Sequence, residues 1–148
     1  MATTITPYLT CRNATEAYEF YQKAFGAEPL GIMNLPDGRV MHGALSIDGA
    51  QVYLAEEFPE YGGASPLALN GSPVTIHLQV DDCDAVFAKA VEAGCKVDMP
   101  LDDMFWGDRF GQVKDPYGHK WSIATTKRQP SEEEMKAAVA QFGTGEGA

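Results

Sequence analysis

The sequence contains one long internal repeat, in which two halves follow the same pattern at an offset of about 69 residues. The glycines Gly49 and Gly118 stand 69 positions apart, and each lies in a turn between two segments patterned as hairpin strands. The glycines that end the preceding amphipathic stretches, Gly26 and Gly94, are 68 positions apart. Two copies of so long a unit do not make a solenoid. The repeat therefore predicts a duplicated module of one strand, one helix and about three further strands, βαβββ.

The first module is expected at about 4–57 and the second at about 73–126, with a linker rich in Gly, Pro, Ser and Asn at 58–72. Together they predict a single domain at 1–130, an ordinary size for one hydrophobic core. After it, Ser131 and Glu134 form a capping box that predicts a short helix to about Phe142, and we expect 131–148 to be this helix and a disordered tail. The expected helices within the modules are 13–25 and 82–94, and the expected strands are 4–11, 28–34, 39–48, 51–57, 73–80, 96–100, 109–115 and 119–126.

Charge and hydropathy exclude several classes of partner. Lys and Arg total 11 against 21 Asp and Glu, which gives a formal charge of −10, and nucleic-acid binding depends on clustered basic residues that this sequence lacks. No apolar run approaches the roughly 18 residues of a membrane span, and the N-terminus does not resemble a secretory signal. We therefore expect a cytoplasmic protein that binds neither nucleic acid nor membrane.

The three cysteines do not form a metal or disulfide pattern. Cys11, Cys83 and Cys95 are an odd number, and none belongs to a CxxC pair. We interpret them as small buried residues, since free cysteine is among the most buried residue types. A catalytic thiol is the alternative.

Three stretches carry a family resemblance: PYLTCRNATEAYEFYQKAFGAE near the start, VMHGALSIDG in the middle, and DDMFWGDRFGQVKDPYGHKWSIAT near the end. With these stretches the chain resembles the vicinal oxygen chelate superfamily, which includes glyoxalase I, bleomycin-resistance proteins, fosfomycin-resistance transferases and extradiol dioxygenases. Within it the chain is similar to the PhnB-like subgroup. The resemblance implies an α+β fold in which paired βαβββ modules form a curved mixed sheet around a cavity, and it implies a homodimer.

The resemblance also implies where a divalent metal would bind, on the first and last strand of each module. In this chain the four positions are Thr6, Tyr53, Thr75 and Ser122, and the internal repeat relates them in pairs at an offset of 69. None of them is His, Asp, Glu, Cys or Gln, and hydroxyl oxygens are poor ligands for Zn²⁺, Ni²⁺ or Fe²⁺. We therefore expect no metal and no other cofactor.

Two histidines leave a displaced metal site open as an alternative. His77 lies two residues after Thr75, so the two side chains share a strand face, and His42 lies in the third strand of the first module. With Glu56 or Glu57 as a third ligand, they could hold Zn, Ni or Mn. The chain would then be a metal-dependent lyase or isomerase of the glyoxalase type. A weaker variant of the enzyme hypothesis uses His77 as a general base without metal.

Strand alternation extends the expected cavity wall beyond these positions. If Thr6 and Thr75 face inward, so do the residues two and four positions further along each strand. Together with His42, the predicted ligand-binding residues are Tyr8, His42, Tyr53, His77, Gln79, Trp106, Arg109 and Ser122. This wall of hydroxyls, imidazole and amide suits a small molecule of mixed polarity. It contains no evident nucleophile–base pair, so no catalytic residue is assigned, and whether the protein is an enzyme stays open.

Two of these residues belong to the loop at 102–111 and have alternative interpretations. Trp106, with Met104 and Phe105, could form the rim of the cavity or pack on the other module or a dimer mate. Arg109 could clamp a carboxylate or phosphate of the ligand, or pair with Asp102, Asp103 or Asp108. The following Asp-Pro-Tyr-Gly stretch at 115–118 is a β-turn signature, and His119 after it is interpreted as a turn or interface residue. The leading hypothesis is a metal-free protein that binds a small molecule.

Overall fold

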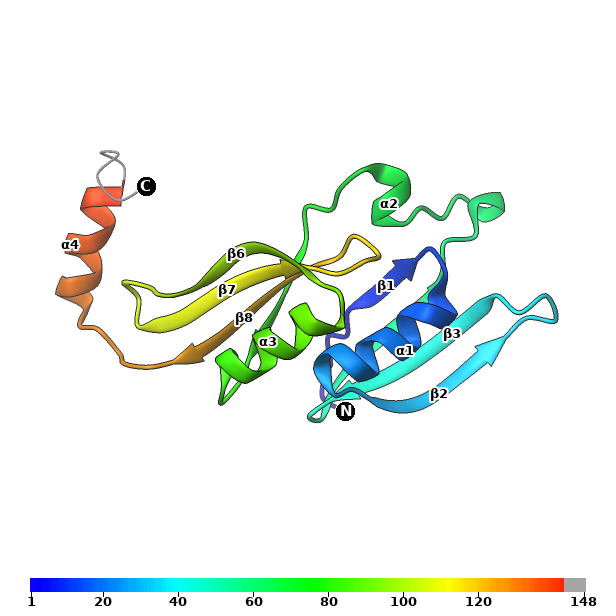
Figure 1. The fold of residues 1–148 in the computed structure, drawn as a ribbon, viewed down its shortest axis with the longest axis horizontal. Coiled ribbons are helices and arrows are strands. Elements are labelled where there is room, and N and C mark those ends of the chain that lie inside the picture. The colour runs from blue at the N-terminus through cyan, green and yellow to red at the C-terminus, as the bar shows by residue number, and fades with distance from the viewer. Residues whose placement is uncertain (143–148) are drawn as a thin grey trace.

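The computed structural model describes residues 1–142 and has the expected α+β architecture of two βαβββ modules (Figure 1). The elements of the first module are β1 (Tyr8–Cys11), α1 (Ala14–Phe25), β2 (Glu28–Asn34), β3 (Val40–Ile47) and β4 (Ala50–Glu56). Those of the second are β5 (Thr75–Gln79), α3 (Cys83–Ala93), β6 (Lys96–Asp103), β7 (Asp108–Lys114) and β8 (Lys120–Thr126). Each module forms its own four-stranded mixed sheet, in the orders β1-β4-β3-β2 and β5-β8-β7-β6. The duplication read from the glycine spacing is thus confirmed as a duplicated topology.

The register of the sheets preserves the offset of 69. In each module the first and last strands run parallel. Tyr8 of β1 stands opposite Tyr53 of β4, and His77 of β5 stands opposite Ser122 of β8. The expected site residues of the outer strands therefore fall at matching positions of the two sheets.

The core lies between the two helices and the faces of the sheets that they cover. α1 begins after Asn13 and ends at Gly26, whose φ of 64° is a left-handed conformation that glycine adopts readily. Its aromatic residues form a continuous face at helical spacing, and those that are buried are Tyr18, Phe20, Tyr21 and Phe25. The two helices also pack against each other, so the modules share one core.

A buried carboxylate in the turn between β7 and β8 joins the modules. Asp115 accepts hydrogen bonds from the hydroxyl of Tyr21 in α1 and from the indole Nε1 of Trp121, the latter at 2.8 Å. Its other oxygen accepts from the backbone N–H groups of Tyr117 and His119. His119 Nε2 in turn lies 2.9 Å from the carbonyl oxygen of Thr10 in β1. The Asp-Pro-Tyr-Gly turn therefore ties the second module to the first.

The structure differs from the expected boundaries in three places. β1 begins at Tyr8 rather than residue 4, since the preceding Pro7 has no N–H to donate. β6 extends to Asp103 through two irregularities in its pairing with β7. The linker contains a 3₁₀ turn, η1 (Pro59–Tyr61), and a one-turn helix, α2 (Pro66–Leu69), which Ser65 caps by accepting from the Ala68 N–H.

The helix predicted from the capping box is present as α4 (Glu132–Phe142). The expected disordered tail, 143–148, lies outside the described residues. Within residues 1–142, no helix has the length and apolar character needed to cross a membrane.

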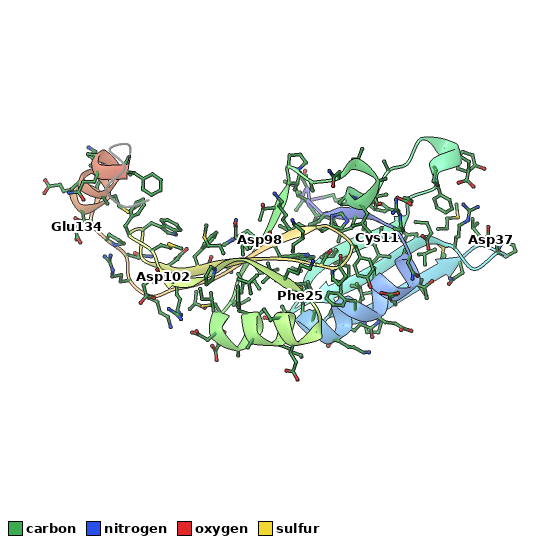
Figure 2. The ribbon with its side chains drawn as sticks, turned by 45° about the horizontal axis from the view of Figure 1, so that its top comes forward. Cys11, Phe25, Asp37, Asp98, Asp102 and Glu134 are labelled. Carbon is green, nitrogen blue, oxygen red and sulfur yellow. The ribbon has the colours of Figure 1, made fainter. Side chains whose placement is uncertain are left out.

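The two faces of the sheets are covered unequally. α1 and α3 lie together on one side of the sheets, whereas α4 and the segment that contains α2 lie on the other side, at separate places along the molecule (Figure 2). We call the side opposite α1 and α3 the open face. Side chains that alternate away from the core therefore point to this open face.

Candidate functional site

The first module carries an aromatic and imidazole cluster on its open face. Leu9 and Leu54 are buried toward the core, so their strand neighbours Tyr8 and Tyr53 point the other way. The Tyr8 hydroxyl lies 2.7 Å from Nδ1 of His42, and the three ring centroids are 4.9–5.6 Å apart in edge-to-face geometry. Tyr8 is 55% exposed, although such rings are ordinarily covered. The cluster is therefore an ordered but uncovered surface.

The second module carries a hydrogen-bonded chain on its open face. His77 Nδ1 lies 2.7 Å from the hydroxyl of Ser122, and Nε2 lies 2.8 Å from Oε1 of Gln79. The Gln79 amide nitrogen donates to Thr126 Oγ1 at 2.8 Å, so its oxygen faces the histidine. An amide oxygen only accepts, which assigns the His77 proton to Nε2 and makes Nδ1 the acceptor for Ser122. The neighbours of His77 thus fix its tautomer.

Phe110 is a site residue that sequence reasoning missed. It stacks on His77 with ring centroids 6.0 Å apart and planes at 18°. Phe110 in β7 precedes Gly111 just as His42 in β3 precedes Gly43, and both glycines pair with matching residues of the last strand. Each module therefore sets an imidazole beside an aromatic ring. The imidazole stands on the third strand in the first module and on the first strand in the second module. Aligning the two hairpins on these glycines would have identified Phe110.

Trp106 joins the second cluster, whereas Arg109 does not. The Trp106 ring contacts Phe110 at 5.6 Å and Phe105 at 5.1 Å, which extends the open-face aromatic surface into the turn between β6 and β7. Arg109 points to the opposite side, where its Nε lies 3.1 Å from Asp84 of α3 and its Nη1 lies 3.5 Å from Asp103. Asp84 and then Asp103 raise the pKa of the guanidinium. The expectation that Arg109 lines the same site as His77 and Trp106 is therefore corrected.

A cleft of about 500 Å³ lies where the two modules meet. Its lining includes Thr6 in the segment before β1, Gln51 of β4 and His77 of β5. Gln51 accepts a hydrogen bond from the Tyr53 hydroxyl at 3.2 Å, so the cleft reaches both clusters. Another cleft of the same volume, between the end of α1 and the start of α3, contains none of the expected site residues.

The residues present do not fit a divalent metal. Both nitrogens of His77 already have hydrogen-bond partners, and Nδ1 of His42 lies 2.7 Å from the hydroxyl of Tyr8. Glu56 accepts from the Ala14 N–H at the start of α1. Glu57 is held by Ser65 and Arg12, which lower its pKa. Among residues 1–142, no group of three or more His, Cys, Asp or Glu side chains is arranged to hold an ion.

Comparisons with known proteins agree with this architecture. Residues 4–123 match the Glyoxalase/Bleomycin resistance protein/Dioxygenase superfamily. The protein Rv0887c of Mycobacterium tuberculosis is 44% identical over 144 residues, covering 95% of this chain and 85% of that protein. The crystal structure of PA1353 from Pseudomonas aeruginosa has a TM-score of 0.70 at 24% identity, over 86% of this chain and all of that one. The PhnB protein from Bacillus cereus has a TM-score of 0.62 at 22% identity, over 83% and 99% of the two chains.

Proposed function

Since the chain belongs to the Glyoxalase/Bleomycin resistance protein/Dioxygenase superfamily, we propose that it is a PhnB-like protein that binds a small organic molecule without a metal ion. The observation that carries the proposal is the uncovered cluster of Tyr8, His42 and Tyr53 on the open face. Its rings offer flat apolar surfaces, and its hydroxyls and imidazole offer hydrogen bonds. A ligand of mixed polarity is bound by this combination.

The chemistry of the second cluster supports binding rather than turnover. The hydroxyl of Ser122 donates to His77 as a nucleophile donates to its base, but Ser122 is only 3% exposed, and this burial keeps its oxygen away from a substrate. The imidazole, the Gln79 amide and the Phe110 ring instead form a fixed surface of known hydrogen-bond polarity. The fold alone would not decide this, because the superfamily joins enzymes and binding proteins on one scaffold.

The open faces require a cover, and a second copy of the chain supplies one. Tyr8 and Met33, which is 57% exposed and pairs with His42 across β2 and β3, leave apolar surface on the open face of the first module. Trp106 and Phe110 extend the same kind of surface on the second. In the proposed homodimer, the first module of one copy faces the second module of the other. Each of the two sites then combines Tyr8, His42 and Tyr53 with the partner's second cluster.

Fluorescence titration tests the proposal, because Trp106 lies in the site and Trp121 is buried in the core. The probes are a glycopeptide of the bleomycin class, a glutathione S-conjugate and an alkylphosphonate. At least one is expected to quench Trp106 saturably in protein treated with EDTA. Replacing Tyr53 by Ala is expected to weaken that binding by about tenfold or more, as the loss of one buried aromatic contact would do.

The matched control is Val91→Ala, which removes an exposed apolar side chain of α3, on the side of the sheets opposite the open face, and should leave the affinity unchanged. Elemental analysis of untagged protein completes the test. Near-stoichiometric Zn, Ni, Mn or Fe, with binding or turnover that EDTA abolishes, would instead establish the metal-dependent lyase or isomerase. Failure of all three probes to bind saturably would also count against the proposal.

A further inference from the structure

We propose that α4 is an arm that docks on a second copy of the chain, against η1 and the β2–β3 end of that copy. The proposal rests on the pairing of open faces in the proposed function and adds a contact that this pairing does not by itself contain. Three features of the structure support it: the apolar stripe of α4, the placement of α4 at one end of the molecule, and exposed apolar groups at the other end.

The apolar stripe of α4 has little to pack against within its own chain. Met135, Val139 and Phe142 recur at intervals of four and three residues, so they share one face of the helix. Val139 is 57% exposed and Phe142 is 68% exposed, and no residue of Glu132–Phe142 is buried. A helix of 11 residues is marginal in water without tertiary contacts. The stripe therefore needs a covering surface.

The contacts of α4 with its own chain lead toward the ligand site. Phe105 contacts Phe142 with ring centroids 6.0 Å apart, and Nη1 of Arg128 lies 3.8 Å from Oε2 of Glu134. From Phe105 the rings continue without a break through Trp106 and Phe110 to His77. This aromatic row connects the stripe of α4 to the second cluster, so a partner seated on that cluster extends directly to α4.

The shape of the molecule determines which part of the partner α4 meets. α4 stands at one end of the elongated chain, and the β2–β3 turn with η1 stands at the other (Figure 1). α4 and the linker segment both lie on the open side of the sheets (Figure 2). The proposed pairing of each first module with the partner's second module requires a twofold axis perpendicular to the long axis of the molecule, and such an axis places each end of one copy over the opposite end of the other. Each α4 therefore comes to the η1 end of its partner.

That end presents exposed apolar groups suited to the stripe. Tyr61 of η1 is 86% exposed, and its ring lies beside Phe58 with centroids 6.4 Å apart. Arg39 stacks over Phe58 at 4.7 Å and pairs with Glu60, which holds η1 against the β2–β3 turn. Apolar side chains on an ordered support are what the stripe of α4 requires.

Disulfide trapping tests the arm directly. The variant carrying Val139→Cys and Tyr61→Cys should, on oxidation, form a covalent species of twice the 16.0 kDa chain mass. The two positions lie at opposite ends of one chain, so a bond within a chain is not available to compete (Figure 1). The native cysteines are buried, which keeps background cross-linking low. The matched control combines Tyr61→Cys with Ala137→Cys, on the opposite face of α4.

A second pair of variants measures the energy of the contact. Val139→Asp places a charge in the stripe and should raise the dimer dissociation constant by about tenfold or more in sedimentation equilibrium, whereas Ala137→Asp should not. Equal trapping of the two cysteine pairs would contradict the proposal that α4 docks on a second copy. Equal dimer dissociation constants for Val139→Asp and Ala137→Asp would contradict it as well. The probe titration is read separately. If a probe binds saturably but the Val139 and Ala137 cysteine pairs are trapped equally, the arm alone is disproved. If no probe binds and the two pairs are trapped equally, the proposed function is disproved as well.

Discussion

At the scale of single residues, the thiol of Cys11 shows how burial removes a chemical function that the sequence left open. Burial is the largest cause that raises its pKa, and the charges of Asp115 and Glu56 raise it further. Burial likewise raises the pKa of Cys95 to about 12. Only the thiolate is reactive, so at about pH 8 both groups remain protonated and inert. We expect the native protein to react with a disulfide reagent such as Ellman's far more slowly than free cysteine does.

The same sample unfolded in guanidinium chloride is the control, and all three thiols should then titrate rapidly. The comparison requires no substitution, so folding of a variant does not complicate it. One thiol that reacts quickly in the native state would restore the hypothesis of a catalytic cysteine. It would also show that the environment of that residue is more open than the structure has it.

At the scale of elements, Gly107 in the turn between β6 and β7 packs against the segment that precedes α4 and holds it in place. Gly107 has a φ of +102°, and a Cβ there would lie 2.0 Å from the carbonyl oxygen of Arg128. Its own carbonyl accepts from the N–H groups of Lys127 and Arg128. Gly107→Ala should therefore displace the segment before α4, with a loss of unfolding free energy of roughly 2 kcal/mol or more. Trypsin should cleave faster after Lys127 and Arg128.

Gly38 provides a matched control in the equivalent turn of the first module. Its φ is +92°, yet a Cβ there would meet nothing within 4 Å. Gly38→Ala should therefore cost only the backbone strain of an unfavourable φ, about 1 kcal/mol. Equal losses for the two variants would show that the close approach to Arg128 has no part in holding the segment.

The elements also show which parts of the fold could be predicted. Helices α1 and α3 could be predicted from the spacing of their apolar residues and from the glycines that end them, because each helix buries one continuous face. The one-turn helix α2 was not, since four residues beginning at Pro66 are too few to show a period. Alternation correctly grouped Tyr8 with Tyr53 and His77 with Ser122. The direction of Arg109 depended on the position of Asp84 in α3, which no local pattern encodes.

At the scale of the whole molecule, the two modules are held in one cooperative unit by the buried carboxylate of Asp115. Asp115 belongs to the second module, so the hydrogen bond that it accepts from Tyr21 of α1 crosses between the modules, whereas the bond from Trp121 anchors the carboxylate within its own module. Both donors are buried, so losing the carboxylate would deprive each of them of the acceptor that it has in this structure. The shared core and this carboxylate together predict that the wild-type chain unfolds in a single transition.

Asp115→Asn would keep the size of the side chain but replace one accepting oxygen by an NH₂ group. That group would face either the hydroxyl of Tyr21 and the indole N–H of Trp121 or the two backbone donors, and donors cannot satisfy donors. We expect a loss of roughly 2–4 kcal/mol in the free energy of unfolding, measured by urea denaturation with tryptophan fluorescence. Asp98→Asn, at an exposed position of β6 (Figure 2), makes the same chemical change and should leave the urea midpoint unchanged. An unaltered midpoint for Asp115→Asn would mean that the modules are joined by apolar packing alone. A second, separate transition in that variant would instead show that this one carboxylate couples the halves of the chain into a single folding unit.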